Sequence, residues 1–277
     1  TQPDLRKHAG RVAPLMSTRV QELFDLAGHV ALVTGGSRGL GLQVAEALGD
    51  AGAQLVLTSR KASDLQEACR YLAARNISAS WIAGDAADPI QLTRIASEAM
   101  SLHGRVDVLV NNAGATWGAP AEEYPIEAWD KVMNLNLRSV FLLSQYVAGH
   151  SMIPRGQGRI IMVASIASSI GMMSGLEAVA YYASKGGLAN LTRALAAEWG
   201  KHGITVNAVA PGWFPSKMSH GTIQAVGADA MAAQIPLRRL GGDDDLKGAA
   251  LLFASRAGQH ITGQVLAVDG GYTAVGR

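Results

Sequence analysis

The chain carries the segment TGGSRGLG at residues Thr34–Gly41, and the prediction of its architecture begins there. The segment follows the apolar run HVALV, residues 29–33, and precedes LQVAEAL, in which apolar positions recur at helical spacing. A buried strand, a glycine turn and a helix in this order predict a cradle for a nucleotide phosphate, because free N–H groups at a helix N-terminus attract anions. Gly35 permits the tight turn, while Gly39 and Gly41 permit close approach of the phosphates and of the helix to the strand. A glycine turn that serves packing alone is the alternative interpretation.

Short apolar runs alternate with segments of helical periodicity along the rest of the chain. Further strands are expected at 54–58, 79–83, 106–110, 159–163, 204–208 and 264–268. Helices are expected at 62–75, at 89–103, from 125 to beyond 141, at 180–200 and at 243–255. Continuous apolar strands require helices on both faces of their sheet. Repeated strand–helix units therefore predict a single-domain α/β fold, a Rossmann-type, doubly wound parallel sheet of about seven strands.

This alternation indicates one dinucleotide-binding domain over residues 26–277, with its ligand at the carboxyl ends of the strands. Residues from about 213 to 236 include two glycines and predict a lid that closes over substrate. Residues 1–25 are expected to form a loosely ordered arm. Its basic cluster lacks the apolar region of a secretory signal, and a mitochondrial-type leader is the alternative.

Composition excludes several function classes. A net charge of +2 does not indicate a nucleic-acid partner, and no apolar run reaches the ~18 residues that a membrane span needs. Cys69 is the single cysteine, which rules out an intrachain disulfide and favours a reducing, cytoplasmic location. The acidic run at 242–245 and the seven histidines show no ligand spacing, so we predict no metal.

The carboxyl end of the second strand predicts which dinucleotide binds. NAD-binding Rossmann units carry an acidic residue there, but this chain has Ser59 and Arg60, with Arg38 nearby in the glycine turn. Two guanidinium groups and a hydroxyl suit a 2′-phosphate, which predicts NADP(H). The alternative is that Arg60 only begins the next helix in solvent.

Further candidates follow the third and fourth strands. Asp85 is placed to bind the adenine amino group and the Ala86 N–H to bind the ring, whereas Asp88 before Pro89 predicts a helix N-cap. The tetrad NNAG, residues Asn111–Gly114, is expected to tie strand ends together and to let a cofactor approach.

The strongest catalytic signal is Tyr181 followed four residues later by Lys185, because residues four apart share a helix face. An ammonium ~4 Å from the phenol, together with the nicotinamide charge, is expected to lower the phenol pKa from ~10 towards ~7. Tyr181 would then protonate a carbonyl oxygen. Ser165 ends the fifth strand and is expected to hydrogen-bond that oxygen and the phenol. Asn136 is expected to bend its helix and to hold a water that links Lys185 to solvent.

These motifs, together with Pro211-Gly212 and Asp269-Gly-Gly271, resemble in order and spacing the short-chain dehydrogenase/reductase family over about residues 26–275. The resemblance implies a catalytic tetrad of Asn136, Ser165, Tyr181 and Lys185, an NADP preference marked by Arg38, and a homotetramer formed through the two long central helices and the last strand. The implied and predicted cofactor contacts are Gly35, Ser37, Arg38, Gly39, Leu40, Gly41, Ser59, Arg60, Asp85, Ala86, Asn112, Ala113, Gly114, Tyr181, Lys185, Pro211, Gly212, Trp213, Phe214 and Ser216.

Residues 111–118 and 210–218 resemble most the 3-oxoacyl reductases of the family, particularly those of rhamnolipid synthesis, with gluconate 5-dehydrogenase-like and tropinone-reductase-like members also similar. Ser165 and Tyr181 are sixteen residues apart, more than is usual in the family, and the extra residues fall at 170–176. Candidate pocket walls are apolar and favour an acyl chain or a hydrophobic ketone over a sugar acid, although some are expected in the core. They are Trp117, Met172, Met173, Leu176, Trp213, Phe214 and Met218.

The sequence thus predicts NADPH-dependent reduction of a 3-oxoacyl thioester or a similar apolar ketone. A sugar-acid or polyol dehydrogenase is the alternative, and a non-catalytic nucleotide-binding scaffold is a remote one. An acyl-carrier partner would be acidic, and Arg155 and Arg159 are candidates for a basic docking patch.

Overall fold

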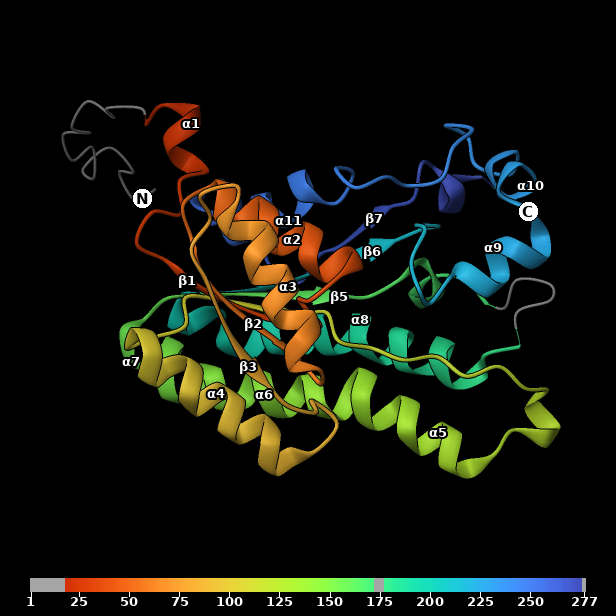
Figure 1. The fold of residues 1–277 in the computed structure, drawn as a ribbon, viewed down its shortest axis with the longest axis horizontal. Coiled ribbons are helices and arrows are strands. Elements are labelled where there is room, and N and C mark those ends of the chain that lie inside the picture. The colour runs from red at the N-terminus through yellow and green to blue at the C-terminus, as the bar shows by residue number, and fades with distance from the viewer. Residues whose placement is uncertain (1–17, 172–176, 276–277) are drawn as a thin grey trace, which may run out of the picture.

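A computed structural model describes residues 18–171 and 177–275, and within them seven parallel strands form one sheet (Figure 1). The strands lie in the spatial order β3-β2-β1-β4-β5-β6-β7. Their bounds are β1 Val30–Thr34, β2 Gln54–Ser59, β3 Ala79–Ala83, β4 Val108–Asn111, β5 Gly158–Val163, β6 Ile204–Pro211 and β7 Val265–Val268. From β1 the sheet extends through β2 and β3 on one side and through β4 and the later strands on the other, so the winding changes direction beside β1. Such a switch point places a ligand crevice at the carboxyl ends of these strands.

Helices cover both faces of the sheet, as the continuous apolar strands predict (Figure 1). One face packs on α4 Pro89–His103, α6 Ser139–Val147 and α8 Val179–Trp199. The other packs on α2 Gly39–Asp50, α3 Ala62–Ala73 and α11 Lys247–Ala254. Alternate residues of β1 pack into the hydrophobic cores on the two faces of the sheet. Leu32 lies in the first core and Val33 in the second, and both are fully buried. Burial on both faces fixes the strand register, because a slip by one residue would exchange the two sets.

The long helix predicted from residue 125 is a succession of α-helical and π-helical turns. It consists of α5 Ile126–Met133, a π turn at Asn134–Arg138, α6, a second π turn at Ala148–Met152, and α7 Ile153–Arg155. A π turn widens the helix and turns the following side chains, and such turns are common at functional sites. The first one contains Asn136, the residue at which a bend of this helix is predicted.

Other boundaries shift by a few residues. The helix predicted from residue 243 begins at Lys247, because the Asp245 carboxylate accepts a hydrogen bond from the Gly242 N–H and pairs with Arg239 instead of entering the helix. Short 3₁₀ turns lie at Ala121–Glu123, Ile166–Ser168, Gly200–His202, Arg256–Gly258 and Tyr272–Ala274. None of the helices within the described ranges has the length and apolar character that a bilayer-spanning helix requires.

The two segments predicted to lie outside the core contain short helices. Within the predicted arm, residues 18–25 include α1 Val20–Leu23, and residues 1–17 lie outside the described residues. The predicted lid contains α9 His220–Val226 and α10 Ala228–Ala232, and beyond them Ile235 packs with Ile166 and Tyr272. Closure of this segment over a substrate stays a prediction.

Candidate active site

The glycine turn between β1 and α2 has the geometry of a phosphate cradle. Gly35 and Gly39 have φ of +63° and +53°, a conformation that side chains rarely adopt. A Cβ on Gly41 would lie 2.3 Å from the Gly35 carbonyl oxygen, so only glycine allows this approach. Space is open beside Gly39, and no side chain caps the N-terminus of α2. The uncapped N–H groups of that helix fit a pyrophosphate.

Asn112 fastens the glycine turn to β4. Its Nδ2 donates to the Thr34 and Gly35 carbonyl oxygens at 2.9 and 3.2 Å. The Thr34 hydroxyl accepts hydrogen bonds from the Asn112 and Ala113 N–H groups at 2.9 and 3.0 Å. The predicted tie between strand ends is thus made by Asn112, and the part played by the Thr34 hydroxyl was not predicted. Asn111 is buried and bonds to Ser144 of α6 instead.

The carboxyl end of β2 presents a hydroxyl and two arginines. The Ser59 Oγ is buried and has no hydrogen-bond partner among the described residues, and such an orphaned hydroxyl fits a ligand oxygen. Arg60 is exposed. Arg38 is exposed as well, but its Nη1 lies 3.2 Å from the Asp64 Oδ2 of α3, an ion pair that was not predicted.

The residues predicted to bind adenine, Asp85 and Ala86, lie in a loop in which Asp85 is hydrogen-bonded to nearby residues. The Asp85 Oδ1 accepts the Ala87 N–H at 2.9 Å, and the Asp85 N–H donates to the Gln91 side chain at 3.0 Å. One carboxylate oxygen of Asp85 therefore has a bond within the loop, while Ala86 packs against the core. The predicted N-cap is confirmed, because the Asp88 Oδ1 accepts the Ile90 N–H at 2.9 Å.

Tyr181 and Lys185 lie on one face of α8, beside the end of β5. The Lys185 Nζ is 5.6 Å from the centroid of the Tyr181 ring, and Ser165 is close enough to the Tyr181 phenol to influence its pKa. Lys185 is 4% exposed, and its Nζ donates to the Val163 carbonyl oxygen at 2.7 Å. The three predicted catalytic side chains from β5 and α8 are therefore gathered at one edge of the sheet.

Burial governs the electrostatics of this cluster. Burial raises the pKa of the Tyr181 phenol, an effect that the hydrogen bond to Ser165 opposes. Burial also lowers the pKa of Lys185 to about 8. In the protein's own groups burial thus outweighs any effect of Lys185 on the phenol, and a lowered phenol pKa produced by Lys185 together with the nicotinamide charge stays a prediction. The desolvation cost dominates, and the ammonium is bonded to a backbone carbonyl instead of to the phenol.

Asn136 is fully buried in the π turn and joins two elements of the site. Its Oδ1 accepts the Ala115 N–H at 2.8 Å, and its Nδ2 donates to the Ala115 carbonyl at 2.9 Å and to the Ser184 Oγ at 3.0 Å. The Ser184 hydroxyl donates in turn to the Tyr181 carbonyl at 2.8 Å. The side-chain N–H groups of Asn136 are thus bonded to protein, its Oδ1 has capacity for a second hydrogen bond, and the water expected on that amide stays a prediction. Ser184 was missed, although it lies within the Tyr181–Lys185 motif.

Comparison with known proteins assigns the family. A family model described as Enoyl-(Acyl carrier protein) reductase, one of those for short-chain dehydrogenases/reductases, matches residues 35–273. The chain belongs to the short-chain dehydrogenase/reductase family.

Two curated relatives with different substrates in their names are similar to this family member. It is 38% identical over 253 residues to gluconate 5-dehydrogenase of Gluconobacter oxydans, and this match covers 91% of this chain and 97% of that protein. It is 40% identical over 257 residues to a rhamnolipids biosynthesis 3-oxoacyl-(acyl-carrier-protein) reductase of Pseudomonas aeruginosa, covering 90% and 98%. A crystal structure of a gluconate 5-dehydrogenase from Burkholderia cenocepacia in complex with NADP and tartrate has a TM-score of 0.87 and 34% identity, covering 93% of this chain and 100% of that one.

The segment after β6 of this short-chain dehydrogenase/reductase is tied to the C-terminal residues. The Gly212 N–H donates to the Val268 carbonyl at 3.0 Å, and a Cβ on Gly212 would lie 2.7 Å from the Asp269 Cβ. Gly212, after Pro211 at the end of β6, therefore allows the two segments to touch. The Ser216 hydroxyl bonds to Ser219.

The predicted pocket walls divide into three groups. Trp117 and Met218 are each 46% exposed, and Trp213 is half-buried beside the Ile166–Tyr272 cluster. Phe214 is wrong as a pocket wall, because its side chain is buried in the core against Gly241. The remaining predicted walls, residues 172, 173 and 176, lie outside the described residues.

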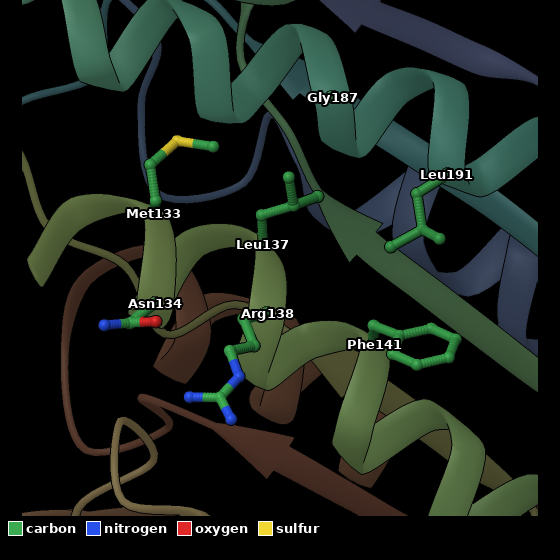
Figure 2. A pocket seen from close by; sticks show the side chains of 7 residues that line it. All are labelled: Met133, Asn134, Leu137, Arg138, Phe141, Gly187 and Leu191. Carbon is green, nitrogen blue, oxygen red and sulfur yellow. The ribbon is translucent and has the colours of Figure 1, made fainter. Parts of the chain in front are cut away.

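A pocket of about 420 Å³ lies on the outer surface between α8 and the helices on either side of the first π turn. Figure 2 shows Leu137 and Leu191 pointing into the space between these helices, with Phe141 beside them. None of the four predicted catalytic residues lines it. The full lining is Met133, Asn134, Leu137, Arg138, Phe141, Gly187 and Leu191.

The arginines considered for acyl-carrier docking lie at the end of the sheet opposite the catalytic cluster. Arg159 is the second residue of β5 and Ser165 follows the end of the strand, so the two are separated by about 20 Å over six residues. Arg155 is engaged with the Asp107 carboxylate at 3.0 Å. A docking patch formed by these two arginines therefore does not adjoin the catalytic cluster.

Acidic and histidine side chains form no metal-binding group of three or more in the part of the chain that the structure describes. In the acidic run that follows the lid, Asp244 and Asp245 pair with Lys247 and Arg239, and Asp243 accepts a hydrogen bond from Gln43. Asp243 thus contacts α2, and Asp244 contacts the first residue of α11.

Proposed function

We propose that this protein is an NADPH-dependent reductase that converts the carbonyl of a 3-oxoacyl thioester, or of a similar apolar ketone, to a hydroxyl. The observation that carries the proposal is the buried Lys185 with its Nζ 5.6 Å from the centroid of the Tyr181 ring on the same face of α8, with Ser165 close to the phenol. This pairing supplies an acid and an oxygen-binding hydroxyl at the ligand edge of a Rossmann-type sheet.

Each catalytic side chain has a distinct task in this proposal. A nicotinamide dinucleotide supplies hydride chemistry when it is bound. Tyr181 donates its phenol proton to the carbonyl oxygen, which the Ser165 hydroxyl aligns by a hydrogen bond. Lys185, with a pKa of about 8, is predominantly protonated at pH 7, and its charge favours the phenolate that remains after proton transfer. Asn136 acts as a positioning residue, because its amide fixes Ala115 and, through Ser184, the backbone of Tyr181.

The glycine turn and the end of β2 would hold the dinucleotide. The uncapped start of α2 suits the pyrophosphate, and Ser59, Arg38 and Arg60 suit a 2′-phosphate. The similar gluconate 5-dehydrogenase of Burkholderia cenocepacia was crystallised with NADP, which supports this choice.

Two substrate classes have support. The exposed apolar side chains of Trp117 and Met218, together with 40% identity to a 3-oxoacyl reductase, favour an apolar ketone. A sugar-acid or polyol dehydrogenase is the second candidate, supported by 38% identity to a gluconate 5-dehydrogenase.

Initial rates with acetoacetyl thioester and with gluconate, each with both nicotinamide cofactors, test the proposal. We expect the thioester with NADPH to give the highest kcat/KM, because the exposed walls are apolar. Faster oxidation of gluconate with NADP⁺ would instead establish the sugar-acid alternative. Tight NADPH binding without turnover of any ketone in a broad panel would indicate a scaffold.

We also propose that the protein assembles as a homotetramer. The apolar pocket shown in Figure 2, which the exposed Phe141 helps to line, supports one assembly face along α6 and α8. The edge strand β7 offers a second face, on which Leu266 is 40% exposed. Two independent faces of this kind produce a closed tetramer.

A further inference from the structure

The arginine expected to select NADPH already has an anionic partner within the chain. Arg38 immediately precedes α2 and has extended backbone dihedral angles, so its side chain leaves the glycine turn towards α3. There its Nη1 lies 3.2 Å from the Asp64 Oδ2, in the first turn of α3. Asp64 is stabilised as an anion at this position by the positive end of the α3 dipole.

Two cations lie in the connection that leads into α3. Arg60 and Lys61 lie between β2 and α3, are both exposed and take part in no ion pair among the described residues. The hydroxyl of Ser59 in the same loop is buried without a partner among those residues. A 2′-phosphate bound here would gain from the cations and the hydroxyl but would have to compete with the Asp64 carboxylate for Arg38.

We propose that Asp64 is a specificity-determining residue, which weakens NADPH binding by competing with the 2′-phosphate for Arg38. The inference rests on the proposed function, because it assumes that a nicotinamide dinucleotide occupies the glycine turn. A guanidinium bonded to Asp64 must break or share that bond to reach the phosphate. NADH has no 2′-phosphate and is not affected by this competition. Asp64 therefore narrows the difference in affinity between the two cofactors.

Asp64→Asn tests the proposal, because asparagine keeps the shape of the side chain but removes its charge. The dissociation constants of NADPH and NADH would be measured by calorimetry on the intact protein. We expect NADPH to bind about threefold to tenfold more tightly, as removal of one exposed charge partner allows, while NADH changes less than about twofold. High salt should reduce the gain, because both charges are exposed.

Asp50→Asn is the matched control. Asp50, in α2, also pairs with an arginine, because the Arg75 Nη2 just beyond α3 lies 3.2 Å from its Oδ2, but Asp50 lies at the far end of α2 from the glycine turn. Its loss should leave both dissociation constants unchanged. Equal thermal unfolding midpoints of the two variants would show that any difference in affinity is local.

Arg38→Ala completes a double-mutant cycle with Asp64→Asn. The proposal requires that Asp64→Asn has no effect on NADPH affinity once Arg38 is absent. It is overturned if Asp64→Asn leaves NADPH affinity unchanged or weakens it, or if the gain persists without Arg38. Preference of the unaltered protein for NADH would refute the cofactor assignment of the proposed function, but a gain confined to NADPH in Asp64→Asn would still support the role of Asp64.

Discussion

Lys185 is the residue whose environment has the largest consequence for both stability and activity. It is an ammonium that is 4% exposed, its Nζ is bonded to a backbone carbonyl, and burial lowers its pKa from 10.5 to about 8. The folded protein therefore carries a desolvation cost that a lysine on the surface would not have. A cation held at this cost beside Tyr181 is typical of a functional site, where pKa shifts concentrate.

The pH dependence of unfolding measures this cost. Between pH 8 and 10.5 the unfolded chain binds more protons than the folded one at Lys185, so the free energy of unfolding should rise with pH in this window. Relative to Lys185→Met, which has no ionisable group, the unaltered protein should gain about 2 kcal/mol between about pH 7 and pH 10. Denaturant titrations of both proteins across this range provide the measurement, and parallel profiles would contradict the lowered pKa.

At the scale of elements, the segment from α5 to α6 contacts the candidate active site on one side and lines a surface pocket on the other. The π turn directs Asn136 inward to Ala115 and Ser184, while Leu137 and Phe141 line the outer pocket with Leu191 of α8. Assembly through that outer face would therefore contact the same turn that positions Tyr181. In the proposed tetramer, this arrangement would couple assembly to the integrity of the active site.

Phe141→Asp tests this face. A carboxylate in the apolar pocket cannot be buried against a second copy without a large desolvation cost, so the variant should not form the tetramer. Sedimentation velocity at low protein concentration gives the mass directly. Ile90→Asp is the control, because Ile90 is an 81% exposed apolar residue on α4 and its substitution should leave assembly intact. An unchanged mass for Phe141→Asp would exclude this face as an interface.

At the scale of the whole molecule, the sequence predicts what depends on local pattern and misses what depends on contacts between distant segments. The strands were predictable because apolar runs such as 204–208 need cover on both faces, and the N-cap at Asp88 because its hydrogen bonds are local. The π turn was not predictable, because Asn136 bonds to Ala115, twenty-one residues away. The burial of Phe214 was missed for the same reason.

The direct test of the central claim is hydride transfer by Tyr181→Phe. The variant removes one hydroxyl from a half-buried ring, so the fold and the affinity for NADPH should be preserved. If Tyr181 is the proton donor, NADPH oxidation with the best ketone of the panel should fall by at least about 100-fold, while the dissociation constant of NADPH stays within about twofold. Turnover close to that of the unaltered protein, with NADPH bound normally, would contradict the account.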